Sequence, residues 1–202
     1  MPPAPPADDI RADAAAAMAA IETAAFSISR EGAPISISGL EFSSATGVYA
    51  APDRAEAVLE VRAGDVTARL GTIAIGERVW LTDPVSGRWN ELDAGTGFNP
   101  AVVFDRDGGW PAILGQDMAD AEADGYDART VVLTGTVSAE RVAVLTAGLA
   151  DPQPTVVEML IDRETSRLRR VSFDTSGSDG VSSWTIELTD YDDPVAIAPP
   201  NA

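Results

Sequence analysis

The segment AEAVLEVRAGDVTARLGTIAI, residues 55–75, decides the fold class, because it contains two strand patterns joined by a tight turn. In its first half Ala57, Leu59 and Val61 point to one face, and the mostly charged residues between them point to the other. A period of two is typical of a strand that is buried on one side. Ala63-Gly64-Asp65 then supplies the turn into a second strand at 66–75.

Similar short strands continue on both sides of this hairpin, from Phe26 to Tyr191, with turn residues at nearly regular spacing. Tight turns join antiparallel neighbours, so we expect a continuous antiparallel sheet of ten or eleven strands. No β-α-β rhythm and no internal repeat interrupts it. Helical patterns occur three times, at 8–24, in the apolar stretch 99–114, and after Ser138 up to Gly148. The fold class is therefore α+β.

Proline-rich ends bound the folded region. Residues 1–7 (MPPAPPA) form an extended, flexible tether, which suggests that an upstream segment was removed. Residues 8–194 are expected to form a single domain, and residues 195–202 a C-terminal tail.

The composition removes most catalytic chemistry. The 202 residues include no Cys and no His, and all 14 basic residues are Arg. The chain therefore lacks the usual general base, thiolate and imidazole metal ligands, and a Schiff-base lysine. A net charge of −18 opposes nucleic-acid binding. No apolar run approaches the roughly 20 residues of a membrane span. We predict that the protein is not an enzyme and holds no cofactor.

Acidic residues occur in two patterns that resemble a calcium site and a glycosidase active site, and both have simpler explanations. Asp105-Arg106-Asp107-Gly108 begins like a calcium loop but lacks the later ligands, so a solvated turn is the better interpretation. Asp120, Glu122 and Asp124 alternate along one predicted strand. Paired carboxylates catalyse glycoside hydrolysis, but the chain has few aromatic residues to stack on a sugar. We expect an acidic strand that faces solvent, and no metal site.

Three longer segments carry a family resemblance by their order and spacing. They are GERVWLTDPVSGRWNEL (Gly76–Leu92), FNPAVVFDRDGGWPAIL (Phe98–Leu114) and DGYDARTVVLTGTVSAERVAVL (Asp124–Leu145). Together with the Ala-rich opening helix, they make the chain similar to the LprG/LppX (LppX_LprAFG) lipoproteins, whose fold resembles that of the lipoprotein carrier LolA. The last segment, in which a strand end runs into a helix, is the most specific.

The resemblance implies a half-open, strongly curved antiparallel barrel with helices on its concave side. An apolar cavity between the two layers would hold the acyl chains of a lipid or glycolipid. Members are exported and anchored to the outer face of the cell membrane through a lipidated cysteine, which here would precede Pro2. We also expect a monomer and, as a candidate partner, a membrane efflux transporter.

The cavity-lining candidates are the inward apolar residues of the three helical segments, since a dry cavity binds apolar guests. They are Met18, Ile21, Val103, Phe104, Trp110, Ile113, Leu114, Val142, Leu145 and Leu149. The alternative is that each is an ordinary core residue. Gly108-Gly109 and Pro111 flank Trp110, and we hypothesise that this hinge-like segment gates the cavity mouth.

Two functions fit this pattern. The first is a non-catalytic lipid carrier. The second is a periplasmic sensor or interaction module of the RseB type, which uses a similar half-barrel. The chain ends soon after the last strand, without a second domain, and this favours the carrier.

Overall fold

A single antiparallel sheet of 12 strands organises the part of the chain that this computed structural model describes, residues 5–37, 39–93 and 96–200, with backbone alone at 124–126. The strands are β1 (Thr23–Gly32), β2 (Ser36–Ile37), β3 (Leu40–Ala50), β4 (Arg54–Ala63), β5 (Val66–Ile75), β6 (Arg78–Thr82), β7 (Trp89–Glu91), β8 (Met118–Tyr126), β9 (Thr130–Val137), β10 (Thr155–Asp162), β11 (Leu168–Gly177) and β12 (Gly180–Thr189).

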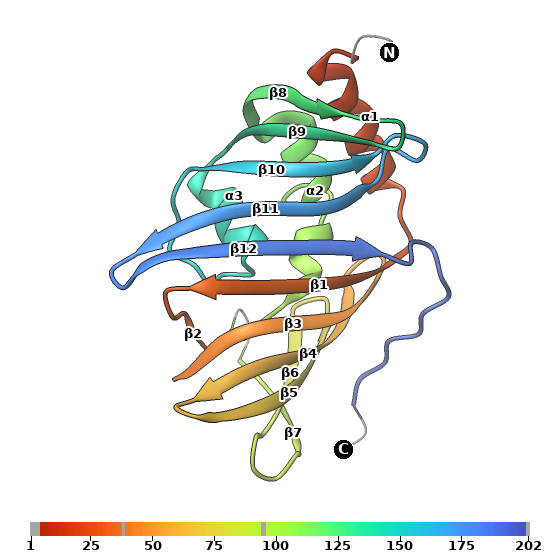
Figure 1. Cartoon of the computed structure of the whole chain (residues 1–202). Coiled ribbons are helices and arrows are strands. Elements are labelled where there is room, and N and C mark those ends of the chain that lie inside the picture. The colour runs from red at the N-terminus through yellow and green to blue at the C-terminus, as the bar shows by residue number, and fades with distance from the viewer. Residues whose placement is uncertain (1–4, 38, 94–95, 201–202) are drawn as a thin grey trace.

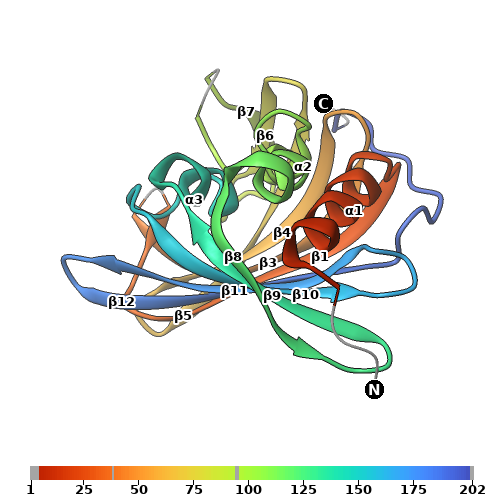
Figure 2. The ribbon, with the colours of Figure 1, turned by 90° about the horizontal axis from the view of Figure 1, so that it is seen from above.

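Two meanders meet at the middle of this sheet. Its order is β7-β6-β5-β4-β3-β1-β12-β11-β10-β9-β8, with β2 paired to β3 at one side. Strand β1 thus lies between β3 and β12 and joins the first half of the chain to the last strand (Figure 1). The sheet is strongly curved and not closed, and the helices lie on its concave side (Figure 2). The predicted half-open antiparallel fold is confirmed.

The helical elements come at the three places that the sequence indicates. They are α1 (Ala7–Ala19), the 3₁₀-helix η1 (Pro100–Phe104), α2 (Trp110–Ala112) continuing into the π-helix η2 (Ile113–Asp117), and α3 (Ala139–Leu145). The predicted extension of the first helix to residue 24 is wrong. Ala24 pairs with Tyr49 in the sheet and is buried, because strand pairing outweighs the helix propensity of alanine.

Helix α1 seals one end of the concave face. Ile10, Ala14 and Met18 form its buried stripe, at the spacing of one helix face. On the same helix the Arg11 guanidinium donates hydrogen bonds to the carbonyl oxygens of Leu114 (2.9 Å) and Gly115 (3.2 Å), and so ties α1 to η2. No helix in the described residues is both long and apolar enough to span a membrane.

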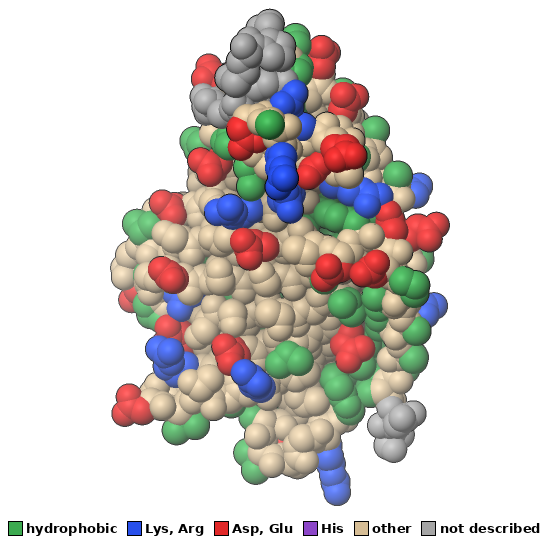
Figure 3. Space-filling view, turned by 45° about the vertical axis from the view of Figure 1, so that its right-hand side comes forward, with side chains coloured by type: hydrophobic (Ala, Val, Ile, Leu, Met, Phe, Trp, Pro, Cys, Tyr) green, Lys and Arg blue, Asp and Glu red, His purple; other side chains and the backbone are tan. Residues whose placement is uncertain are grey.

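The convex face carries a smaller apolar cluster at the β5–β7 end. Ile73 and Trp80 pair across β5 and β6, and Trp89 lies on the same face of β7. Val195 and Ile197 of the C-terminal tail pack on this cluster, and Ile197 is almost fully buried. Figure 3 shows hydrophobic side chains gathered beside this end of the chain.

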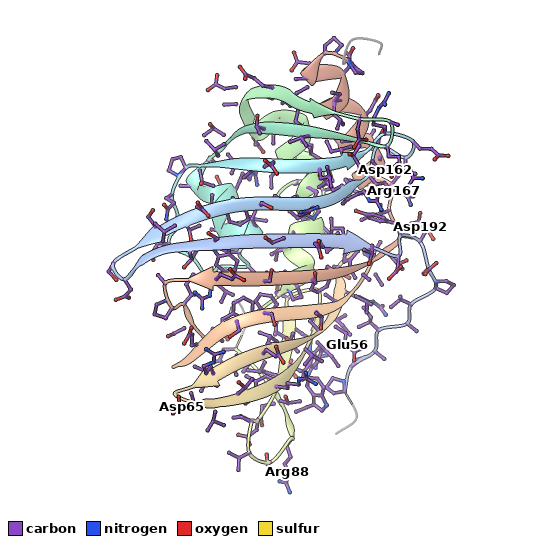
Figure 4. All side chains as sticks on the ribbon, in the orientation of Figure 1. Glu56, Asp65, Arg88, Asp162, Arg167 and Asp192 are labelled. Atoms are coloured by element: carbon purple, nitrogen blue, oxygen red, sulfur yellow. The ribbon has the colours of Figure 1, made fainter. Side chains whose placement is uncertain are left out.

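Asp192 fastens the end of β12 to the start of β1. Its carboxylate accepts a hydrogen bond from the Glu22 backbone N–H (2.9 Å) and forms an ion pair with Arg167. These two contacts, the first being the larger, lower the pKa of Asp192. Asp162, Arg167 and Asp192 lie at this same end of the sheet (Figure 4). Asp192 therefore serves as a structural contact between the end of β12 and the start of β1.

The regular alternation predicted for the β8 carboxylates is wrong. The register shifts between Ala119 and Glu122, and Asp120 has a positive φ of 50° in the resulting bulge. Such a bulge puts an extra residue into the strand and breaks the period of two. Asp120 and Glu122 are nevertheless both exposed, as expected, and the side chain of Asp124 lies outside the described residues.

Candidate functional site

The ten predicted lining residues all lie in one hydrophobic core between the sheet and the helices. Nine of them are buried, and Leu149, in the turn after α3, is partly buried. The structure therefore brings these residues together on the concave side of the sheet. Their role in holding a ligand stays a prediction.

An apolar groove of about 810 Å³ lies on the outer side of η1 and α3. The β5–β6 turn and the start of β6 form one wall, and α3 with the turn after it forms the other. Its lining residues are Gly76, Glu77, Val79, Thr96, Gly97, Asn99, Val102, Glu140, Ala143, Val144, Ala147 and Gly148. None of the ten predicted residues is among them.

A smaller hollow of about 280 Å³ extends the groove, since both share Gly76, Asn99, Val102 and Val144. The extension reaches the β3–β4 turn at Pro52-Asp53 and the loop after η1 at Asp105 and Gly108. Val102 of η1 and Val144 of α3 border both spaces. These two valines are therefore the centre of the candidate site.

Helix α3 is apolar on two faces, and this explains how it can contact both core and groove. Val142 and Leu145 are buried in the core. Ala143 and Val144 form a second apolar stripe that lines the groove, with Glu140 one turn earlier and Ala147 in the turn after the helix. The Ser138 side chain accepts a hydrogen bond from the Arg141 backbone N–H and starts the helix. This second stripe was not predicted, although the run of four apolar residues 142–145 indicates it.

Aromatic contacts hold η1 against the sheet from both ends. The ring of Phe104 stacks on Tyr49 of β3 with centroids 4.1 Å apart, and Phe98 lies 5.9 Å from Phe42 of the same strand. The Asn99 side chain accepts a hydrogen bond from the Ala101 backbone N–H and begins the helical turn. Val103 and Phe104 are buried in the core, whereas Val102, between the core and the surface, lines the groove. Burial raises the pKa of the Tyr49 hydroxyl, so it stays neutral.

The loop between η1 and α2 is fixed by Arg141 of α3. Its guanidinium donates hydrogen bonds to the Asp117 carboxylate (2.9 Å) and to the Gly108 carbonyl oxygen (3.1 Å). The Asp105 carboxylate, in the same loop, accepts hydrogen bonds from the backbone N–H groups of Asp107 and Gly108. These bonds form the solvated turn that the sequence predicts. Gly108 lines the smaller hollow, while Trp110 is fully buried. The gating role of this segment stays a prediction.

The chemistry of this site is that of apolar contact. Within the described residues no three acidic side chains are grouped as metal ligands would be. The polar side chains that line the groove are two carboxylates, one amide and one hydroxyl, and the others are small aliphatic side chains and glycines. Concave, mostly apolar sites with a few polar groups are typical of small-molecule binding.

Comparison with known proteins agrees with this architecture. The family model of the LppX_LprAFG lipoproteins matches residues 6–197. The chain belongs to the LppX_LprAFG lipoprotein family. Comparison with curated proteins gives no match. Lipoproteins of this family are exported proteins of the cell envelope.

Two solved structures of this family have the same fold. The chain is similar to LprF from Mycobacterium bovis, with 18% identity, a TM-score of 0.72 and 97% of each chain covered. It is also similar to LppX from Mycobacterium tuberculosis, with 16% identity, a TM-score of 0.65, and 95% of this chain and 98% of the other covered. The predicted LprG/LppX resemblance and the LolA-like fold are therefore confirmed.

Proposed function

We propose that this family member is a non-catalytic carrier that holds the acyl chains of a lipid or glycolipid between its helices and the concave face of its sheet. The groove between α3, η1 and β6 is the mouth. The observation that carries the proposal is the position of Val102 and Val144, which line the groove beside the buried Val103 and Leu145 of the same elements.

Hydrophobic transfer alone is sufficient to drive such binding. Each methylene moved out of water contributes roughly 0.8 kcal/mol, so one long acyl chain offers on the order of 10 kcal/mol before ordering costs. A groove of about 810 Å³ falls within the range of ligand pockets. No general acid, metal ion or nucleophile is needed for this function.

The helices around the groove are short enough to move apart. Helix η1 has five residues and α3 has seven, and they pack on each other rather than on a long helix. A shift of α3 away from η1 would join the groove to the predicted lining set, including Val103, Phe104, Val142 and Leu145. In this mechanism the Arg141 contacts to Asp117 and Gly108 resist opening.

The proposal includes a place in the cell. A lipidated cysteine before the Pro-rich tether anchors the protein to the outer face of the cytoplasmic membrane. There it takes up lipid from the bilayer as a monomer, and a membrane efflux transporter is a candidate partner.

Lipid recovery from the purified protein tests this function. We expect native mass spectrometry and organic extraction to find bound lipid with the wild-type chain. Val102→Trp combined with Val144→Trp should fill the groove and reduce the recovered lipid at least ten-fold. Val156→Trp is the control, because Val156 is 63% exposed on β10 and away from the groove. Equal recovery from the groove variant and the control would contradict the proposed mouth, and no lipid from any form, with no uptake from vesicles, would contradict the carrier function.

A further inference from the structure

The groove has acidic residues on both walls of its mouth. Glu77 stands on the β5–β6 turn and Glu140 in the first turn of α3, and both are exposed. Asp53 and Asp105 border the smaller extension. Among the described residues that line these two connected spaces, none is basic. Two other surface hollows do contain arginine, Arg163 in one and Arg106 with Arg141 in the other.

Each rim glutamate is followed by an arginine that is bound elsewhere. Arg78 pairs with Glu91 of β7 at 2.7 Å and lies over the Trp80 ring at 4.5 Å. Arg141 pairs with Asp117 at 2.8 Å. Within the described part of the chain, neither the Glu77 nor the Glu140 side chain has a hydrogen-bond or ion-pair partner. The two carboxylates are therefore not paired with a cation at the mouth of an apolar groove.

We propose that Glu77 and Glu140 are specificity-determining residues, which make the protein select lipids with an uncharged head group over lipids with an anionic phosphate. The inference rests on the proposed function. Acyl chains inside the groove would bring the head group to the rim, where a phosphate is repelled by both carboxylates. The hydroxyl groups of an uncharged head group can instead donate hydrogen bonds to the same oxygens.

Coulomb repulsion sets the size of the effect. Two charges some 8 Å from a phosphate, in a medium close to water, change the binding ratio by about five-fold at low salt. At 1 M salt the screening length is about 3 Å, so the discrimination should disappear. A purely steric preference would not depend on salt in this way.

The test compares two labelled lipids with identical acyl chains, a diacylglycerol and a phosphatidylglycerol, in uptake from neutral phosphatidylcholine vesicles. Wild-type protein should favour the diacylglycerol at low salt. In Glu77→Gln/Glu140→Gln the ratio of phosphatidylglycerol to diacylglycerol affinity should rise about five-fold, and the rise should vanish at 1 M salt. The matched control is Glu56→Gln/Glu158→Gln, which removes the same charge from exposed residues of β4 and β10; Glu56 is labelled in Figure 4.

The possible outcomes distinguish a failure of this inference from a failure of the proposed carrier function. If the rim variant and the control change the ratio equally, net charge alone is responsible and the inference is overturned. An unchanged ratio in the rim variant, with the diacylglycerol bound, also overturns it while leaving the proposed function intact. If neither lipid binds to wild type, the carrier function fails, and this inference fails with it. Thermal unfolding of both variants checks that α3 is still folded.

Discussion

The two ends of the helical layer differ in how tightly they cover the sheet. At one end α1 packs along α2 and η2, its stripe of Ile10, Ala14 and Met18 is buried, and Arg11 bonds to two carbonyl groups of η2. At the other end α3 packs on η1, and a groove of about 810 Å³ lies beside them. A helix of 13 residues can bury a continuous stripe, whereas elements of five and seven residues leave part of their apolar surface uncovered.

The first way to test this difference is to delete apolar volume at each end. Leu114→Ala, at a fully buried position of η2, should lower the free energy of unfolding by about 3 kcal/mol, because the packed surroundings cannot close the cavity. Val144→Ala, at the half-buried groove position, should cost less than about 1 kcal/mol. Urea denaturation measures both. Equal losses would mean that the groove end is packed as tightly as the α1 end.

The second test adds a single methyl group. A Cβ at Gly109 would lie 2.3 Å from the Val103 carbonyl oxygen, so Gly109→Ala should destabilise the protein by about 2 kcal/mol. At Gly115, in η2, the same methyl group would meet the Ala15 Cβ at 3.7 Å, an ordinary contact. Gly115→Ala should be neutral or slightly stabilising, and thermal unfolding compares the two. A harmless Gly109→Ala would show that the loop before α2 can move away from η1 easily, as the gating hypothesis requires.

The third test concerns two buried tryptophans. The Trp184 indole N–H donates to the Thr175 hydroxyl at 2.9 Å, whereas the Trp110 indole N–H is buried with no acceptor among the described residues. Both Trp→Phe changes replace the indole with a smaller phenyl ring, but only Trp184→Phe removes a hydrogen bond. It should cost about 1 kcal/mol more than Trp110→Phe in chemical denaturation. The opposite order would indicate that the Trp110 N–H is hydrogen-bonded in solution and that the α1 end is less closed than its packing indicates.

The smallest effect is expected at the Asp192 contact beside α1. Its folded-state pKa lies below the unfolded value, so its contribution is complete at neutral pH and is lost as the pH falls through the folded pKa. Asp192→Asn should lower the free energy of unfolding by about 1 kcal/mol or less at pH 7, since the carboxylate is partly exposed. The variant should also lose less stability than the wild type as the pH falls. Unfolding measured from pH 7 to pH 2 tests this. If the variant and the wild type lose stability equally between pH 7 and pH 2, other carboxylates are responsible for the acid sensitivity.

Local pattern predicted most of the sheet, because alternation and turn residues act over a few positions. The hairpin at 55–75 forms as expected, with Ala57, Leu59 and Val61 buried. Prediction failed where a distant partner competes with a local preference. Ala24 joins β1 because β3 lies beside it, and the β8 bulge at Asp120 depends on how that strand pairs with β9.

The candidate site was predicted only in part. Nine of the ten chosen side chains are buried in the core; eight of them lie on helices, where apolar residues at helical spacing face a sheet, and Ile21 follows the end of α1. The groove residues Val79, Val102 and Val144 were not predicted, because they come from three separated segments of the chain. No spacing rule connects them before the chain folds.

The sequence alone determined an antiparallel sheet with three helical insertions, an acidic chain without histidine, lysine or cysteine, and the family to which it belongs. Alternation, turn chemistry and composition are local properties, and each can be read over a few residues. Only the tertiary structure decided which apolar residues become solid core and which border the groove, and that Glu77 and Glu140 stand on opposite walls of it. Those properties depend on how segments far apart in the chain pack together, and packing depends on shape in three dimensions.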